Sequence, residues 1–128
     1  MGEPAALQDL QTDALSLTVE NPSAEGHIVV TWRGRANERR PAATLNPFFE
    51  AVMWEAEQSK RTLELHFEAL EHFNSSTIAV LMQLVQRLNA KGIAMTMVYD
   101  GQQKWQKMTF GAMEQLTGDG SLLSLRAL

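Results

Sequence analysis

Two serines and a histidine stand close together near the middle of this chain, and these side-chain types can carry chemistry. His72 is followed by Asn74, Ser75 and Ser76. A serine beside a histidine can be written as a nucleophile with its general base. The chain lacks the Gly-x-Ser-x-Gly turn that exposes a catalytic serine, and nothing marks a carboxylate that orients one of its three histidines. We therefore expect no catalytic residues, and keep a serine-dependent enzyme only as an alternative.

A second group of reactive side chains lies just before the serines. Glu64, His66 and Glu68 alternate along the chain, and His72 follows four residues later. These residue types are common ligands of zinc and of harder cations. On one strand, however, the three alternating side chains span about 13 Å at ~3.3 Å per residue, too far for all of them to bind one ion. The pattern predicts a solvated strand face without a metal site.

The hydrophobic period changes at the serines. Apolar residues alternate with polar ones over 63–67, which indicates a strand with one buried face. Apolar residues over 78–88 follow the spacing of one helix face, so Asn74, Ser75 and Ser76 lie where a helix N-terminus needs a cap. Serines at such a position are explained by local hydrogen bonding alone. The unpaired N–H groups and the dipole of the helix would also tolerate a phosphate there.

The other elements follow from the same rules. The sequence predicts strands at 15–19 and 28–34, a helix capped by Asn46 with Pro47 in its first turn and ending near Ser59, a strand at 93–99, a helix at about 102–116 and a strand at 122–125. The order is β-β-α-β-α-β-α-β. We expect an α/β domain with a mixed five-stranded sheet over residues 13–128, and a flexible leader over residues 1–12. Because the strands alternate, the helices should lie mainly on one face.

Two apolar side chains fall outside the predicted helix faces. Trp54 points almost opposite to the apolar face of its helix, and we interpret it as a contact with the loop at 35–45, with a contact to a partner as the alternative. Val80 falls beside Ser76 and Gln83 on the far side of the helix that follows the serines. An exposed aliphatic residue at that position indicates a surface for a partner protein.

Composition restricts the classes of partner. The 128 residues carry a net charge of −4, which argues against nucleic acids and anionic membranes as partners. The one dense basic cluster, Arg33, Arg35, Arg39 and Arg40, is interpreted as a solvated loop, with an anion site as the alternative. The absence of cysteine, of a long apolar run and of signal-peptide features at the N-terminus predicts a cytoplasmic protein.

The segment around the serines resembles a known family. Asn74-Ser75-Ser76-Thr77-Ile78, preceded by Leu70 and Phe73 and followed by a helix, Lys91-Gly92 and a strand, is similar to the STAS domain of bacterial anti-sigma-factor antagonists. The resemblance implies a STAS-like fold and a small regulatory domain. It also implies a phosphoacceptor serine that a partner serine kinase phosphorylates and a PP2C-type phosphatase dephosphorylates. By position that serine is Ser75, although Asn74 stands where the family usually has aspartate and Thr77 where it has glycine.

From these observations we expect a non-enzymatic signalling protein without a cofactor. It should bind a kinase or an anti-sigma-like protein through the corner formed by Asn74, Ser75, Ser76, Thr77, Val80 and Gln83. Phosphorylation of Ser75 is the expected switch, and Ser76 is the second candidate. The alternative is a STAS-like module that binds a small ligand or acts as a scaffold without phosphorylation. A homodimer is left open.

Overall fold

The computed structural model describes residues 7–20, 26–116 and 121–128. In this part of the chain it has seven strands and three helices. In chain order they are β1 (Leu10–Gln11), β2 (Leu15–Glu20), β3 (His27–Ala36), α1 (Pro41–Ser59), β4 (Thr62–His66), β5 (Leu70–Phe73), α2 (Ser75–Lys91), β6 (Met95–Tyr99), α3 (Lys104–Leu116) and β7 (Leu123–Ala127).

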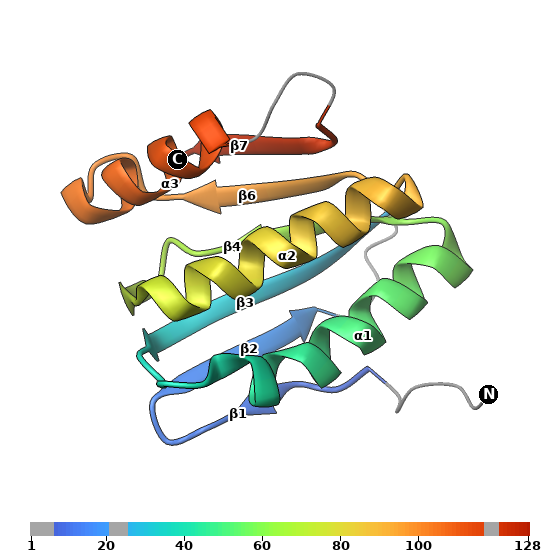
Figure 1. The fold of residues 1–128 in the computed structure, drawn as a ribbon, viewed down its shortest axis with the longest axis horizontal. Helices are drawn as coiled ribbons and strands as arrows, with labels where there is room; N and C mark the ends of the chain where they lie inside the picture. The colour runs from blue at the N-terminus through green and yellow to red at the C-terminus, as the bar shows by residue number, and fades with distance from the viewer. Residues whose placement is uncertain (1–6, 21–25, 117–120) are drawn as a thin grey trace.

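The strands form one mixed sheet in the order β1-β2-β3-β4-β6-β7, with β5 paired to β3. The pairs β1/β2 and β2/β3 are antiparallel, and all other pairs are parallel, which confirms the predicted hairpin and β-α-β units. Figure 1 shows α1 and α2 lying across the same face of the sheet and α3 at the end of β6. The N-termini of α1 and α2 lie at the same end of the sheet, on the left of Figure 1.

The prediction of five strands was wrong, because two short strands carry little periodic signal. β1 has two residues and lies within the segment predicted as a leader. β5 has the burial order in, out, out, in, and therefore does not alternate. The predicted turn at 118–120, and all of the predicted turn at 21–26 except Gly26, lie outside the described residues.

β5 finds a partner because β3 is long and bends. β3 has ten residues, and its pairing shifts register between Gly34 and Arg35, so its first half pairs with β4 and its last residues pair with β5. Gly34 has a φ of +93°, and a Cβ at this position would lie 2.1 Å from the carbonyl oxygen of Ala14. Only glycine fits this bend without displacing the backbone of Ala14. The bend thus brings β5 and the start of α2 to the end of the sheet.

α1 begins at Pro41 and not at Asn46 and Pro47 as predicted. Pro41 takes the first helical turn, which is the position that proline favours, and Pro47 lies inside the helix. The additional residues bury Leu45, which is 1% exposed and lies one turn before the buried Phe48 and Phe49. Both Pro41 and Pro47 could occupy the first turn of a helix, and the prediction chose Pro47 where the structure has Pro41.

The core lies between the sheet and the helices. Leu63 and Leu65 of β4 and Met95 and Met97 of β6 are buried, as predicted. Polar side chains on the opposite face, among them those of Thr18, Thr31 and Thr96, are partly exposed. Among the described residues no helix combines the length and the hydropathy that a membrane span requires.

Candidate functional site

The first turn of α2 is capped by Asn74 and not by either serine. The side-chain oxygen of Asn74 accepts hydrogen bonds from the backbone N–H of Thr77 at 2.9 Å and from the Thr77 hydroxyl at 2.6 Å. Ser75 and Ser76 are the first two residues of the helix, and both are exposed. Within the described part of the chain, neither serine hydroxyl has a hydrogen-bond partner. Capping therefore does not explain why two serines stand here.

Asn74 also joins α2 to the last residue of β3 and to the segment that follows it. Its backbone N–H donates to the carbonyl oxygen of Ala36 at 2.9 Å, and its side-chain Nδ2 donates to the carbonyl oxygen of Glu38 at 2.8 Å. Because Oδ1 must face the N–H of Thr77, Nδ2 must face Glu38. An aspartate could not donate this second bond. Asparagine, which has both an acceptor and a donor, therefore fits this position and aspartate does not.

Two residues of the predicted partner-binding set are inside the protein. Thr77 is 1% exposed, and its hydroxyl is bound to Asn74, so it offers no surface to a partner. Val80 is 6% exposed, and the prediction that it is an exposed aliphatic residue was wrong. The surface that remains consists of Ser75, Ser76, Ala79 and Gln83, all of which are exposed. We call these four residues the Ser75 corner.

Val80 is buried because α2 has two buried sides and not one. Arg87 and Lys91 lie on the same side of α2 as Val80, at helical spacing. Arg87 forms an ion pair with Glu50, and Lys91 forms one with Glu57 at 3.0 Å. Both glutamates belong to α1. The side of α2 that carries Val80 therefore faces α1, while a different side faces the sheet.

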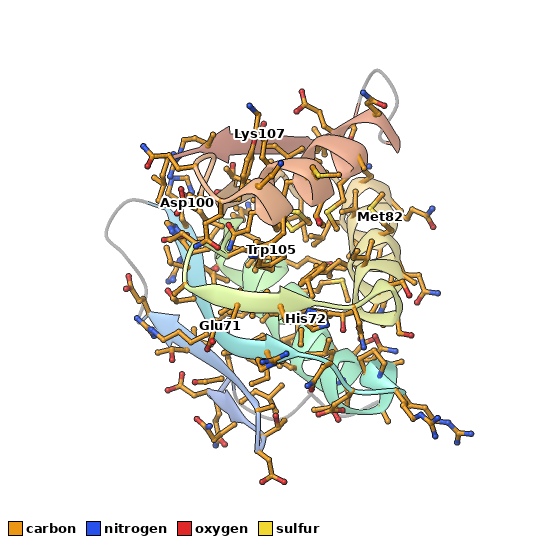
Figure 2. The ribbon with its side chains drawn as sticks, turned by 90° about the vertical axis from the view of Figure 1, so that its left-hand side faces the viewer. Glu71, His72, Met82, Asp100, Trp105 and Lys107 are labelled. Atoms are coloured by element: carbon orange, nitrogen blue, oxygen red, sulfur yellow. The ribbon has the colours of Figure 1, made fainter. Side chains whose placement is uncertain are left out.

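An apolar surface lies on the other side of the Ser75 corner, between α2 and α3. Ile78 and Met82 follow Ser75 at helical spacing and are partly buried, as is Trp105 of α3. Met108 of α3 is 69% exposed, the highest value among the large apolar side chains that the structure describes. Figure 2, which views the left-hand end of Figure 1, shows Met82 and Trp105 on neighbouring helices above β5. The sequence analysis missed this surface because its two halves are more than twenty residues apart.

A buried glutamine on α3 supports this end of the sheet. Gln106 is fully buried, and its Nε2 donates to the carbonyl oxygens of Phe67 at 2.8 Å and of Leu70 at 3.0 Å. Its Oε1 accepts from the backbone N–H of Asp100 at 2.7 Å. One side chain thus satisfies three backbone groups where β4 leads into β5 and where β6 ends. No periodic pattern in the sequence marks this residue.

His72 lies on the surface of the sheet. It is exposed on β5, where its register partner is Arg35 of β3, and the buried Phe73 and the capping Asn74 lie between it and Ser75 in the chain. No hydrogen bond joins His72 and Ser75 in the described structure. The geometry of a nucleophile beside its base is therefore not formed in this structure. Figure 2 shows His72 and Glu71 on the surface strand β5.

Glu64, His66 and Glu68 bind one another on the open face of the sheet. Nε2 of His66 lies 2.6 Å from Oε1 of Glu64, and Nδ1 lies 2.9 Å from Oε1 of Glu68. Arg126 of β7 approaches Oε1 of Glu64 at 3.1 Å. These side chains are only partly exposed, and the simple expectation of a solvated strand face was incomplete. The described residues contain no group of His, Asp and Glu side chains that could hold a metal ion.

The network sets the charge of its members. Both ring nitrogens of His66 face carboxylate oxygens, which only accept hydrogen bonds, so the geometry favours the doubly protonated imidazolium. Burial acts to lower the pKa of His66, but the hydrogen bonds and charges of Glu68 and Glu64 outweigh it and raise that pKa above its usual value. Burial acts to raise the pKa of Glu64, but His66 and Arg126 outweigh it, and the pKa is lowered.

The four clustered arginines are divided between a strand and a turn. Arg33 and Arg35 belong to β3, so the prediction that the whole cluster lies in a loop was wrong for these two. Arg39 and Arg40 lie in the short connection before α1. All four are exposed, and none lies within ion-pair distance of a carboxylate in the described structure. They contrast with Arg87 and Arg126, which are paired.

Trp54 is 36% exposed on the outer side of α1. It was predicted to contact the loop at 35–45, but much of that segment is helical, since α1 begins at Pro41. At 1.5 Å per residue, Trp54 lies about 20 Å further along the helix than Pro41. That distance excludes the predicted contact.

Comparison with known proteins supports the fold. No family model matches the chain, and no curated protein matches its sequence. Among solved structures, the chain is similar to the crystal structure of an anti-sigma factor antagonist from Mycobacterium paratuberculosis. The two share 18% sequence identity, and the superposition has a TM-score of 0.63 and covers 90% of this chain and 89% of the other. The chain therefore has the fold of an anti-sigma factor antagonist, which is the STAS fold.

Proposed function

We propose that this protein is a non-enzymatic regulator that binds a partner protein through the Ser75 corner and is switched by phosphorylation of Ser75. The observation that carries the proposal is the state of Ser75 itself. It is exposed at the first position of α2, while Asn74 alone provides the cap. A hydroxyl that the fold does not use, at the position where the STAS motif has its phosphoacceptor, is available to a kinase.

The partners proposed are a serine kinase, or an anti-sigma-like protein with kinase activity, and a PP2C-type phosphatase, in the cytoplasm. The kinase would transfer the terminal phosphoryl group of ATP to the oxygen of Ser75 and release ADP and the hydroxyl proton. The phosphatase would hydrolyse the ester to serine and inorganic phosphate. Ser76 is the second candidate acceptor because it is equally exposed in the same turn.

The fold should tolerate the phosphate. The added charge of about −1.5 to −2 would meet the unpaired N–H groups and the positive dipole end of α2. A partner docked on the Ser75 corner would have to accommodate this dianion. The neighbouring apolar surface, with Met82 on α2 and Trp105 on α3, provides contact area for such a partner. Phosphorylation would therefore change binding without unfolding the domain.

The test combines site mapping with cross-linking in the native cell. A photo-reactive amino acid placed at Gln83 should capture the partner, and the same residue placed at Ser124 on β7 is the matched control. Phosphopeptide mass spectrometry of this protein, purified from the same cells, should find phosphate on Ser75. Equal capture from both positions, together with no phosphate on Ser75 or Ser76, would show that the corner is not the regulated surface.

A further inference from the structure

Three arginines lie on or just after the part of β3 that pairs with β5 and is hydrogen-bonded to the cap of α2. Arg35, Arg39 and Arg40 are exposed, and no carboxylate lies within ion-pair distance of them in the described structure. Glu38, the acidic residue next to Arg39 in the sequence, accepts a hydrogen bond from the Thr44 hydroxyl at 3.0 Å. The protein as a whole is acidic, so it does not lack carboxylates that could pair with them. The fold leaves this positive charge available.

The hydrogen bonds of Asn74 hold Arg39 close to Ser75. Nδ2 of Asn74 lies 2.8 Å from the carbonyl oxygen of Glu38. Ser75 is the residue after Asn74, and Arg39 is the residue after Glu38. The Cα atom of Ser75 therefore lies about 3.8 Å from that of Asn74, and the Cα atom of Arg39 lies about 3.8 Å from that of Glu38. A guanidinium on its long, flexible side chain can bridge the remaining distance to a phosphate on Ser75.

The pairing of β3 with β5 fixes the rest of the cluster. Ala36 is the register partner of Phe73, and Arg35 is that of His72, so Arg35 also lies at the strand that leads into α2. Arg33 is different. It is paired with Ser16 of β2, before the bend of β3 at Gly34, and lies about 10 Å from Ala36 along the strand. Arg33 thus has the same charge as Arg39 but a more distant position.

We propose that Arg39 and Arg40 bind the phosphate of phosphorylated Ser75 from within the same chain. This inference rests on the proposed function and adds the means by which the phosphate is held. Guanidinium groups bind phosphate with paired, charge-assisted hydrogen bonds, and two of them would balance a charge of about −2. Phosphorylation would then do two things at once. It would add an anion at the corner and withdraw two cations from the surface that a partner meets.

The experiment uses the full chain with phosphoserine inserted at position 75 during translation, so that no kinase is needed. The titration of this phosphate is followed by ³¹P NMR at low salt in three proteins: the otherwise unchanged chain, the double variant Arg39→Ala with Arg40→Ala, and Arg33→Ala. Free phosphoserine titrates near pH 6, and adjacent cations lower that midpoint. We expect a lowered midpoint in the first and third proteins and a higher one in the double variant.

Two further measurements exclude simpler explanations. The unphosphorylated variants should melt within about 2 °C of the unchanged chain, because all three arginines are exposed. High salt should raise the midpoint of the unchanged chain toward that of the double variant. Identical midpoints in all three proteins would overturn the inference, and so would an equal effect of Arg33→Ala. Neither result bears on whether a kinase acts on Ser75, which the cross-linking and phosphate mapping test separately.

Discussion

The open face of the sheet and the Ser75 corner both carry charged and polar side chains, but they use them differently. On the open face, His66 binds Glu64 and Glu68, and Arg126 binds Glu64. At the corner, the two serine hydroxyls have no partner in the described structure, and neither does the nearby Arg39. Two polar side chains at this end of the sheet, in contrast, are fully engaged: Asn74 at the cap of α2 and Gln106 where β4 leads into β5. We infer that the frame of the corner is fixed and its surface is kept free for binding.

The largest effect on stability is expected from removing the buried side chain of Gln106. Gln106→Ala would remove the Gln106 bonds of the Leu70 carbonyl and the Asp100 N–H, while the Phe67 carbonyl would keep its bond from the N–H of Leu70. Each group left without a partner costs about 1–3 kcal/mol. We expect the free energy of unfolding to fall by roughly 3 kcal/mol in urea denaturation. Gln115→Ala, on the same helix but exposed, should change it by less than about 0.5 kcal/mol. Equal stability of the two variants would show that the frame does not depend on Gln106.

The second prediction concerns the departure from the usual motif. Asn74→Asp would place a carboxylate oxygen 2.8 Å from the carbonyl oxygen of Glu38 and remove the donor between them. The negative charge would be favoured by the N-terminus of α2, which offsets part of the loss. We expect a net destabilisation of about 1–2 kcal/mol. Asn37→Asp, at an exposed position in the preceding turn, is the matched control. A more stable Asn74→Asp protein would contradict the assigned hydrogen bonds.

The third prediction tests whether the corner is a binding surface. Ser75→Glu should leave the melting temperature almost unchanged, because the side chain is exposed at a helix N-terminus. It should lower the affinity for the captured partner at least tenfold, or about 1.4 kcal/mol, in a calorimetric titration. Ser75→Ala should bind like the unchanged protein. Ser124→Glu, which adds the same charge on exposed β7, should not weaken binding. Undiminished affinity of Ser75→Glu would exclude the corner as the contact.

The sequence was sufficient to predict elements whose hydrophobic pattern is set by a single buried face. Strands β2, β3 and β4 bury alternate residues, and they were predicted close to their observed positions. β6 was also predicted close to its position, although Val98 on its other face is buried as well. The cap was likewise predicted within Asn74, Ser75 and Ser76, and the structure assigns it to Asn74. The fold and the position of the corner could thus be predicted from local patterns.

The sequence did not predict the positions of residues that contact two neighbouring elements or a distant part of the chain. Val80 was misplaced because α2 packs against both the sheet and α1, and a single-face analysis assigns the second side to solvent. Gln106 was missed because its partners Phe67 and Leu70 are 39 and 36 residues away. β5 was missed because it depends on the bend of β3 at Gly34. Each of these features is set by tertiary contacts that leave no periodic trace.

The smallest effect is expected on the open face, and it depends on pH. The folded-state pKa of His66 is raised above 6.5, so its contribution to stability is complete below that pH and is lost as the pH rises through the folded pKa. The pKa of Glu64 is lowered below 4.5, so its contribution is present above that pH and is lost as the pH falls through the folded pKa. The network should therefore stabilise the fold most between about pH 4.5 and 6.5.

His66→Gln removes the titrating ring from this network while His27 and His72 stay in place. Because the side chains of the network are partly exposed and solvent screens their charges, we expect the unchanged protein to lose less than about 1 kcal/mol between pH 6 and pH 8.5. In His66→Gln that loss should be absent, as measured by urea denaturation at both pH values. The same decline in both proteins would mean that another group causes it. In that case the ion pairs of His66 would make no measurable contribution to stability in this pH range.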